Sequence, residues 1–184
     1  INLNNLEPIW HYDNHDDTDA TPVLELEDGI PYLYSGCEMD HQGYEGLSYI
    51  VKLNGLTGER IWEQKIECKK MTLGEKHFDG GMYSTMLLGT GDCSDLLFTN
   101  ICTNDPPAAG NFYAISKATG EIVYSKKLMH YAWSSPVAIT NDKDEMFVLT
   151  FDCVGHAYII DGKTGEFLVT KLIGINFESS PIVI

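Results

Sequence analysis

Short apolar, β-rich runs separated by polar turns recur along the whole chain. The clearest unit reads PVAIT, an acidic turn NDKDE, then MFVLTF, a loop CVGH, then AYIID, a turn GKTGE and finally FLVTKL. Short apolar runs bounded by turn residues predict strands, and the acidic turns between them predict hairpins. No segment sustains the 3.6-residue period of an amphipathic helix. The pattern therefore predicts an all-β chain of four-stranded antiparallel meanders.

Two sequence markers repeat in the same phase, which makes a chance match improbable. The first is the tripeptide Thr-Gly-Glu after an apolar strand, at 57–59, 119–121 and 164–166. The second is a hydroxyl residue that leads into an apolar strand, beginning at Thr21, Thr85, Ser135 and Ser180. Each unit has about 45 residues, the size of a β-propeller blade.

The Thr-Gly-Glu turn has a local physical role between the third and outer strands of each unit. A short polar residue stands three positions before each Thr, where its side chain can accept hydrogen bonds from the turn's own backbone. The glycine is expected to take a positive φ, which a β-branched residue would resist. The polar residues are Asn54, Ser116 and Asp161, and the turn residues are Thr57, Gly58, Thr119, Gly120, Thr164 and Gly165.

The markers divide the chain into three complete blades with parts of two more. We expect an outer strand of a preceding blade at about 6–13, blades at about 19–68, 81–129 and 132–173, and the inner strand of a following blade at about 175–184. Closed propellers have about four to eight blades. The chain is thus expected to be an arc of a seven- or eight-bladed ring, completed by the rest of a longer chain or by another copy.

One motif resembles a known repeat family. The segment LNGLTGERIW, which ends at Trp62, is similar to the tryptophan-docking motif of pyrroloquinoline-quinone-like (PQQ-like) repeat β-propellers. The resemblance implies that this Trp packs between neighbouring blades. The matching position holds Tyr124 in the next blade and Val169 in the third, and Trp10 in EPIWHYD resembles the outer strand of a preceding blade.

The resemblance leaves the function open between several classes. It favours a non-catalytic bacterial propeller that acts as a scaffold for a ligand or a protein, such as the outer-membrane assembly lipoprotein, and it implies a periplasmic or cell-surface location. The alternatives are a quinone-dependent dehydrogenase, with PQQ and calcium as cofactors, and a metal-binding propeller. The vicinal cysteine pair of alcohol-oxidising members is absent, and no motif singles out a catalytic carboxylate.

The charge balance narrows the range of partners. Twelve basic and 27 acidic residues give a formal net charge of −15. Such a surface repels nucleic acid and tolerates cations or metals. No apolar run reaches the roughly 18 residues of a membrane span, and a leader or anchor in a longer precursor stays open because the chain begins with Ile1.

Candidate binding residues gather in two sets of connections, those from second to third strand and those from outer to next inner strand. Both sets emerge on one face of a propeller, where such folds usually bind ligands. Each of these side chains is either a ligand contact or an ordinary surface or gap-filling residue. They are His11, His15, His41, Tyr44, His77, His130, Tyr131, Trp133 and His156.

Two further groups of residues are candidates for metal binding. Cys37, Cys102 and Cys153 close the second strand of their blades, so they either converge on a soft metal or fill the core as small buried side chains. The acidic stretch that holds Asp13, Asp17 and Asp19 offers hard oxygens for calcium. It lacks the central Gly and distal Glu of a helix-loop-helix calcium site, so a solvated loop is the alternative.

The connection at 67–84 is long for a compact repeat, and long loops are often functional. It holds Lys69, Lys70 and Lys76 in a chain that is otherwise acidic. We expect these lysines to meet an anionic group.

Overall fold

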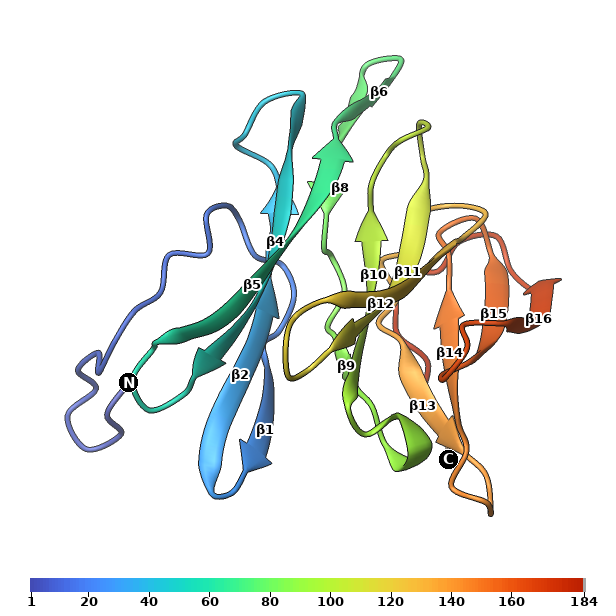
Figure 1. Ribbon diagram of the computed structural model, residues 1–184. Coiled ribbons are helices and arrows are strands. Elements are labelled where there is room, and N and C mark those ends of the chain that lie inside the picture. The colour runs from blue at the N-terminus through green and yellow to red at the C-terminus, as the bar shows by residue number, and fades with distance from the viewer. Residues whose placement is uncertain (184) are drawn as a thin grey trace.

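The three predicted repeats form three antiparallel sheets in the computed structural model, which describes residues 1–183 (Figure 1). Blade 1 has the order β1 (Val23–Glu27), β2 (Ile30–Gly36), β4 (Glu45–Asn54) and β5 (Arg60–Lys69). Blade 2 has β9 (Leu87–Leu88), β10 (Leu96–Cys102), β11 (Gly110–Ser116) and β12 (Ile122–Lys127). Blade 3 has β13 (Val137–Thr140), β14 (Met146–Phe151), β15 (His156–Asp161) and β16 (Phe167–Leu172). The all-β prediction is confirmed.

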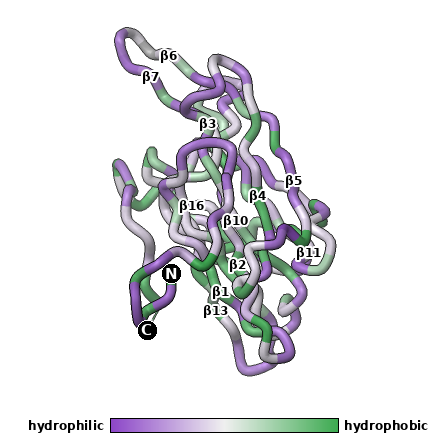
Figure 2. The backbone as a smooth tube through the Cα atoms, turned by 90° about the vertical axis from the view of Figure 1, so that its left-hand side faces the viewer, coloured by the Kyte–Doolittle hydropathy of each residue, from purple (hydrophilic) through white to green (hydrophobic). Residues whose placement is uncertain are grey.

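Four short strands lie in the connections and extend the simple meander. β3 (Glu38–Met39) follows β2, and it pairs with β8 (Gly80–Gly81), which also pairs with β10 of blade 2. The long connection forms a hairpin of β6 (Met71–Leu73) and β7 (Lys76–Phe78), which projects beyond the sheets in Figures 1 and 2. The β3–β8 pair therefore ties a connection of blade 1 to the sheet of blade 2.

Helix is nearly absent from the described part of the chain. Its one helical element is the 3-10 turn η1 (Gly91–Cys93). Within residues 1–183, no helix is long and apolar enough to cross a membrane.

The two expected flanking strands are not paired into a sheet within residues 1–183. No strand is present at 6–13 or at 175–183, and Ile184 lies outside the described residues. A strand of an antiparallel meander pairs with its neighbours in the same blade. The described chain holds only a single strand length of each flanking blade, so neither segment has a ladder partner.

Alternate residues of the middle sheet pack into two separate hydrophobic clusters. Leu97 and Ile101 of β10 pack in the cluster shared with blade 1, whereas Phe98 packs in the cluster shared with blade 3. All seven residues of β10 are consequently buried, although β16 at the edge of the arc is exposed throughout. This is the period-two division expected of a sheet that lies between two others.

At each of three junctions an aromatic ring lies over the glycine of a Thr-Gly-Glu turn in the following blade. A Cβ atom added to Gly120 would lie 2.7 Å from the Trp62 ring, and Trp62 donates its indole N–H to the Lys117 carbonyl at 2.9 Å. Trp10 lies over Gly58 in the same way, and its indole donates to the Gly55 carbonyl at 3.0 Å. The contact thus combines close packing with one hydrogen bond.

The third blade junction uses a tyrosine in the same arrangement. The Tyr124 ring lies 2.6 Å from a Cβ atom added to Gly165, and its hydroxyl donates to the Gly162 carbonyl at 2.7 Å. The corresponding residue of blade 3, Val169, lies on the exposed strand β16. Within residues 1–183 no later turn is present for Val169 to cover.

Backbone geometry at the turns agrees with the local role inferred from the sequence. The φ angles are +75° at Gly58, +76° at Gly120 and +71° at Gly165. The Asn54 side-chain oxygen accepts the Thr57 N–H at 3.2 Å, and the Ser116 and Asp161 side chains accept the equivalent N–H groups of Thr119 and Thr164.

The hydroxyl marker also joins successive blades. The Thr85 N–H donates to the Ser135 hydroxyl at 3.0 Å, and the Ser135 N–H donates to the Ser180 hydroxyl at 3.0 Å. Residues near the C-terminal end of the described chain therefore keep the repeat geometry although they form no strand.

We predict that Gly120→Ala lowers the free energy of unfolding by about 2–4 kcal/mol, because it combines strain at positive φ with a clash against Trp62. Gly29→Ala is the matched control: its φ is +80°, but nothing lies within 4 Å of its added Cβ. This control should cost only about 1 kcal/mol of strain. Urea unfolding of both variants measures the difference, and equal losses would show that the ring contact contributes nothing.

Candidate functional site

The connections of all three blades meet at one face and enclose a cavity of about 440 Å³. This is the face that the strand order predicted, because its walls come from second-to-third and outer-to-inner connections. Carboxylates form one side of the cavity, and aromatic rings form another. The lining residues are Asp17, Asp19, Glu38, Asp40, His77, Phe78, Asp79, Tyr83, Cys102, Tyr131 and Trp133.

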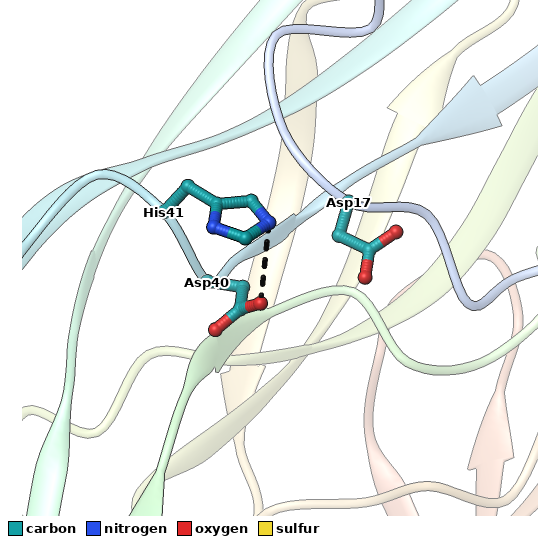
Figure 3. A group of neighbouring side chains, drawn as sticks. All are labelled: Asp17, Asp40 and His41. Atoms are coloured by element: carbon teal, nitrogen blue, oxygen red, sulfur yellow. Dashed lines mark ion pairs between the residues drawn. The ribbon is translucent and has the colours of Figure 1, made fainter.

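Carboxylates and one imidazole form two groups with ligand atoms within 4.8 Å of one another. Asp17, Asp19 and Glu38 form the first group, and Asp17, Asp40 and His41 form the second. Figure 3 shows the second group, in which the His41 imidazole lies 3.4 Å from an Asp40 carboxylate oxygen. The His41 side chain is 77% exposed, so this second group lies at the surface.

Glu38 is the buried member of the acidic wall. It reaches the cavity because β3 pairs with β8 opposite Gly81, whose added Cβ would lie 2.5 Å from the Glu38 Cα. Its N–H donates to the Asp17 carbonyl at 2.9 Å, which holds the N-terminal segment alongside. A side chain at position 81 would therefore push β3 away from the cavity.

Glu38 is a buried residue whose carboxylate lines the cavity without a partner among residues 1–183. Glu38 is 6% exposed, and its carboxylate makes no hydrogen bond or ion pair with any residue of 1–183. Burial raises its pKa to about 7, and the charges of Asp19, Asp17, Asp40 and Asp79 add to the effect. An uncompensated buried carboxylate is costly, so this position favours a bound proton or a bound cation.

The remaining acids of the cavity are partly neutralised by the long connection. Lys70 Nζ lies 2.9 Å from Asp79 and 3.7 Å from Asp40, and it also donates to the Asp40 carbonyl. Lys69 Nζ lies 3.0 Å from Asp105. Acidic side chains of the same chain thus already pair with Lys69 and Lys70, and contact of this loop with an external anion stays a prediction.

Four aromatic rings form a continuous wall beside the acids. The ring centroids of Phe78 and Tyr131 lie 6.2 Å apart, those of Tyr131 and Trp133 lie 5.9 Å apart, and those of Trp133 and Tyr83 lie 6.0 Å apart. All three pairs are tilted by about 50–60°, the edge-to-face range that aromatic rings prefer. The wall spans the connections that enter blades 2 and 3.

The mouth of the cavity is built from one repeated position. Asp19, Tyr83, Trp133 and Glu178 each stand two residues before the hydroxyl marker of their repeat. Together they line an adjoining hollow of about 340 Å³. Two acids and two aromatic rings thus occupy this repeated position, the same residue types that line the main cavity.

Sequence reasoning identified part of this site and missed another part. Asp17, Asp19, His77, Cys102, Tyr131 and Trp133 were candidates, and the structure brings all six to the cavity. Glu38, Asp40, Phe78 and Asp79 were not singled out. Glu38 directly follows the repeated Cys37, so its position relative to that marker was the available signal.

The other candidate histidines have separate local partners. His15 Nε2 lies 3.0 Å from Glu63, and His156 Nδ1 lies 2.9 Å from the buried Asp152. His130 Nδ1 lies 3.1 Å from Cys153 Sγ, and burial lowers the pKa of His130. His11 and Tyr44 are exposed and do not line the cavity. One of the six histidines, His77, therefore faces it within residues 1–183.

Within residues 1–183 the candidate cysteines do not lie together as a ligand group, whereas two acids of the acidic stretch do. Cys37, Cys102 and Cys153 do not form a ligand group with one another in the described chain. Burial raises the pKa of Cys37 and of Cys153 to about 11, and it raises that of Cys102 well above its usual value. Asp13 accepts the His15 N–H at 3.0 Å, whereas Asp17 and Asp19 join Glu38.

The residues of this cavity suit cations better than a quinone cofactor. PQQ carries several carboxylates of its own, and the cavity lining of this chain offers five carboxylates and no Lys or Arg. The lining therefore does not fit that cofactor. Asp17, Asp19 and Glu38 would suit a hard cation such as calcium, which takes carboxylate oxygens.

Comparisons with known proteins support the fold. No family model matches the sequence, and no curated protein matches it. The crystal structure of BamB from Moraxella catarrhalis is similar, with a TM-score of 0.57 and 15% identity over 96% of this chain and 44% of BamB. A europium-containing methanol dehydrogenase aligns with a TM-score of 0.38 and 18% identity over 72% of this chain and 22% of that one.

The likeness to BamB confirms the predicted fold. BamB is a PQQ-like repeat β-propeller, so the resemblance inferred from the sequence holds for the fold, and the three sheets are propeller blades. This chain spans less than half the length of BamB.

We predict that Glu38→Gln makes the fold more stable above pH 7 by about 2 kcal/mol. The folded-state pKa of Glu38 is about 7 and the ordinary value is 4.5, so the native protein binds this proton more tightly than the unfolded chain does. The free energy of unfolding of the wild type should therefore fall as the pH rises from about 4.5 through 7. The variant should not show this pH-dependent loss.

Chemical unfolding of both proteins between pH 4 and 8 measures this difference. Glu166→Gln, at an exposed turn, is the matched control and should follow the wild type. A constant difference between wild type and Glu38→Gln across the range would show that Glu38 has an ordinary pKa.

Proposed function

We propose that this chain is part of a non-catalytic propeller that binds a ligand at the face formed by its second-to-third and outer-to-inner connections. The cavity between the blades carries this proposal, because it joins a buried, unpartnered carboxylate to a wall of four aromatic rings. Ligand sites are typically concave and mostly apolar, with a few placed polar groups that orient the ligand. The occupant is a small molecule or a side chain presented by a partner protein.

The groups in the cavity support binding better than catalysis. The Cys102 thiol is held protonated by burial, so it is a poor nucleophile. The His77 imidazole contacts Thr72 in its own hairpin at 3.2 Å, at the exposed edge of the cavity. No nucleophile within the described lining has a paired base, so the arrangement favours recognition.

A metal-binding propeller is the second candidate, and one observation favours it. Asp17, Asp19 and Glu38 already have carboxylate oxygens within 4.8 Å of one another. Calcium would bring its positive charge to the buried Glu38 and relieve the repulsion among the three acids.

The indole N–H signals of the three tryptophans provide a direct test in an NMR fragment screen. Trp133 lines the cavity, and its indole N–H has no acceptor among residues 1–183, whereas Trp10 and Trp62 donate to backbone carbonyls. We predict that fragments which bind will shift the Trp133 signal and leave the other two unchanged.

Two charge reversals locate the binding face. Asp19→Arg places a long side chain in the cavity and should abolish the shifts, whereas Asp142→Arg makes the same charge change in a turn at the opposite end of the strands. Fragments that still bind the Asp19→Arg variant but no longer bind the Asp142→Arg variant would place the site at the opposite end of the strands. Reduction of a redox dye with PQQ and an alcohol or sugar would instead establish the dehydrogenase alternative.

A further inference from the structure

We propose that the ligand of this cavity is an organic ammonium ion, held between the aromatic wall of Phe78, Tyr131, Trp133 and Tyr83 and the carboxylate of Glu38. This inference rests on the proposed binding function and names the chemical class of the ligand. An organic cation contacts both halves of the cavity, the aromatic rings and the carboxylate. An anionic or neutral ligand would leave the carboxylate without a counter-ion.

The aromatic wall supplies the first half of the recognition. Neighbouring centroids along the four rings are 5.9–6.2 Å apart, so a group of methyl or methylene size can contact several rings at once. Aromatic faces attract cations through the ring quadrupole, and aromatic cages are a recurrent site for quaternary ammonium groups. Alkylammonium carbons also gain from leaving water against apolar surface.

Glu38 supplies the second half as a counter-ion. Its side chain is nine-tenths buried and lines the cavity, and its carboxylate has no partner within residues 1–183. Lys70 of the long connection does not serve as its counter-ion, because it is paired with Asp79 at 2.9 Å. A cation from outside the chain would therefore satisfy a group that the fold leaves uncompensated.

An organic cation accounts for the cavity better than a bare metal ion does. A metal would use the oxygens of Asp17, Asp19 and Glu38, but it would leave the four rings without a role. The volume of about 440 Å³ is also far larger than the roughly 30 Å³ that one water or a small ion occupies. Exposed Asp17 and Asp19 at the rim, with a net charge of −15, would attract cations toward the opening.

The test compares choline and tetramethylammonium with 3,3-dimethylbutan-1-ol, the uncharged carbon isostere of choline. Each probe is titrated into the wild-type chain while the three indole N–H signals are followed. We expect both cations to shift the Trp133 signal saturably, and we expect the isostere to bind at least about tenfold more weakly. Equal binding of choline and its isostere would overturn the role of charge.

Variants separate the two halves of the site. Glu38→Gln should weaken choline binding by about tenfold or more, while Glu166→Gln, the same change at an exposed turn, should have no effect. Phe78→Leu removes one ring from the wall but keeps an apolar side chain, and Phe78→Tyr restores the ring. We expect a loss of about fivefold to tenfold for Leu and recovery for Tyr. Unchanged Trp10 and Trp62 signals confirm that each variant is folded.

A calcium titration distinguishes failure of this inference from failure of the proposed function. Calcium that binds at the cavity while neither cation does would overturn the ammonium assignment and leave a binding face in place. Anionic or neutral fragments that bind there in place of choline would have the same consequence. Absence of binding by these probes and by the fragment screen would overturn both proposals.

Discussion

The contact of an aromatic ring with the bare backbone of a glycine sets the arrangement of this molecule. Trp62 and Tyr124 lie on the outer strands β5 and β12, and Trp10 lies in the segment before blade 1; each ring covers the turn of the blade that follows it. The glycine provides two properties at once, a positive φ for the turn and the space for a ring. Because the same contact recurs at each junction, successive blades take similar relative positions and their connections converge on one face.

The cavity follows from this arrangement combined with one departure from the repeat. In blade 1 the chain after β2 forms β3, which crosses to β8 and thereby joins the sheet of blade 2. That crossing places Glu38 between the blades, where the residue is 6% exposed and lines the cavity. The neighbouring connections supply the rings, so acid and aromatic walls come from different repeats and meet only in the folded chain.

The repeated sequence pattern predicted much of the fold, because apolar runs and turn residues determine strands and hairpins locally. The repeated strands, the turns at Gly58, Gly120 and Gly165 and the gathering of two sets of connections on one face all follow from spacing. The spacing did not show which of the candidate side chains come together in the folded chain. His15 and His156 stand in the expected connections, but acids of their own surroundings hold them, at 3.0 Å and 2.9 Å respectively. Glu38 was missed because its burial depends on the non-local β3–β8 pairing, and its place directly after the repeated Cys37 was the only local signal.

The ionisation of Glu38 is the most direct test of the proposed site, because that site depends on a buried residue whose carboxylate has no partner within residues 1–183. A titration followed by the ¹³C signal of the Glu38 side-chain carboxyl, assigned by its loss in Glu38→Gln, measures the pKa of this group in the folded chain. We expect a titration midpoint of about 7. A midpoint at the ordinary value of 4.5 would contradict it, because the carboxylate would then be hydrated or paired.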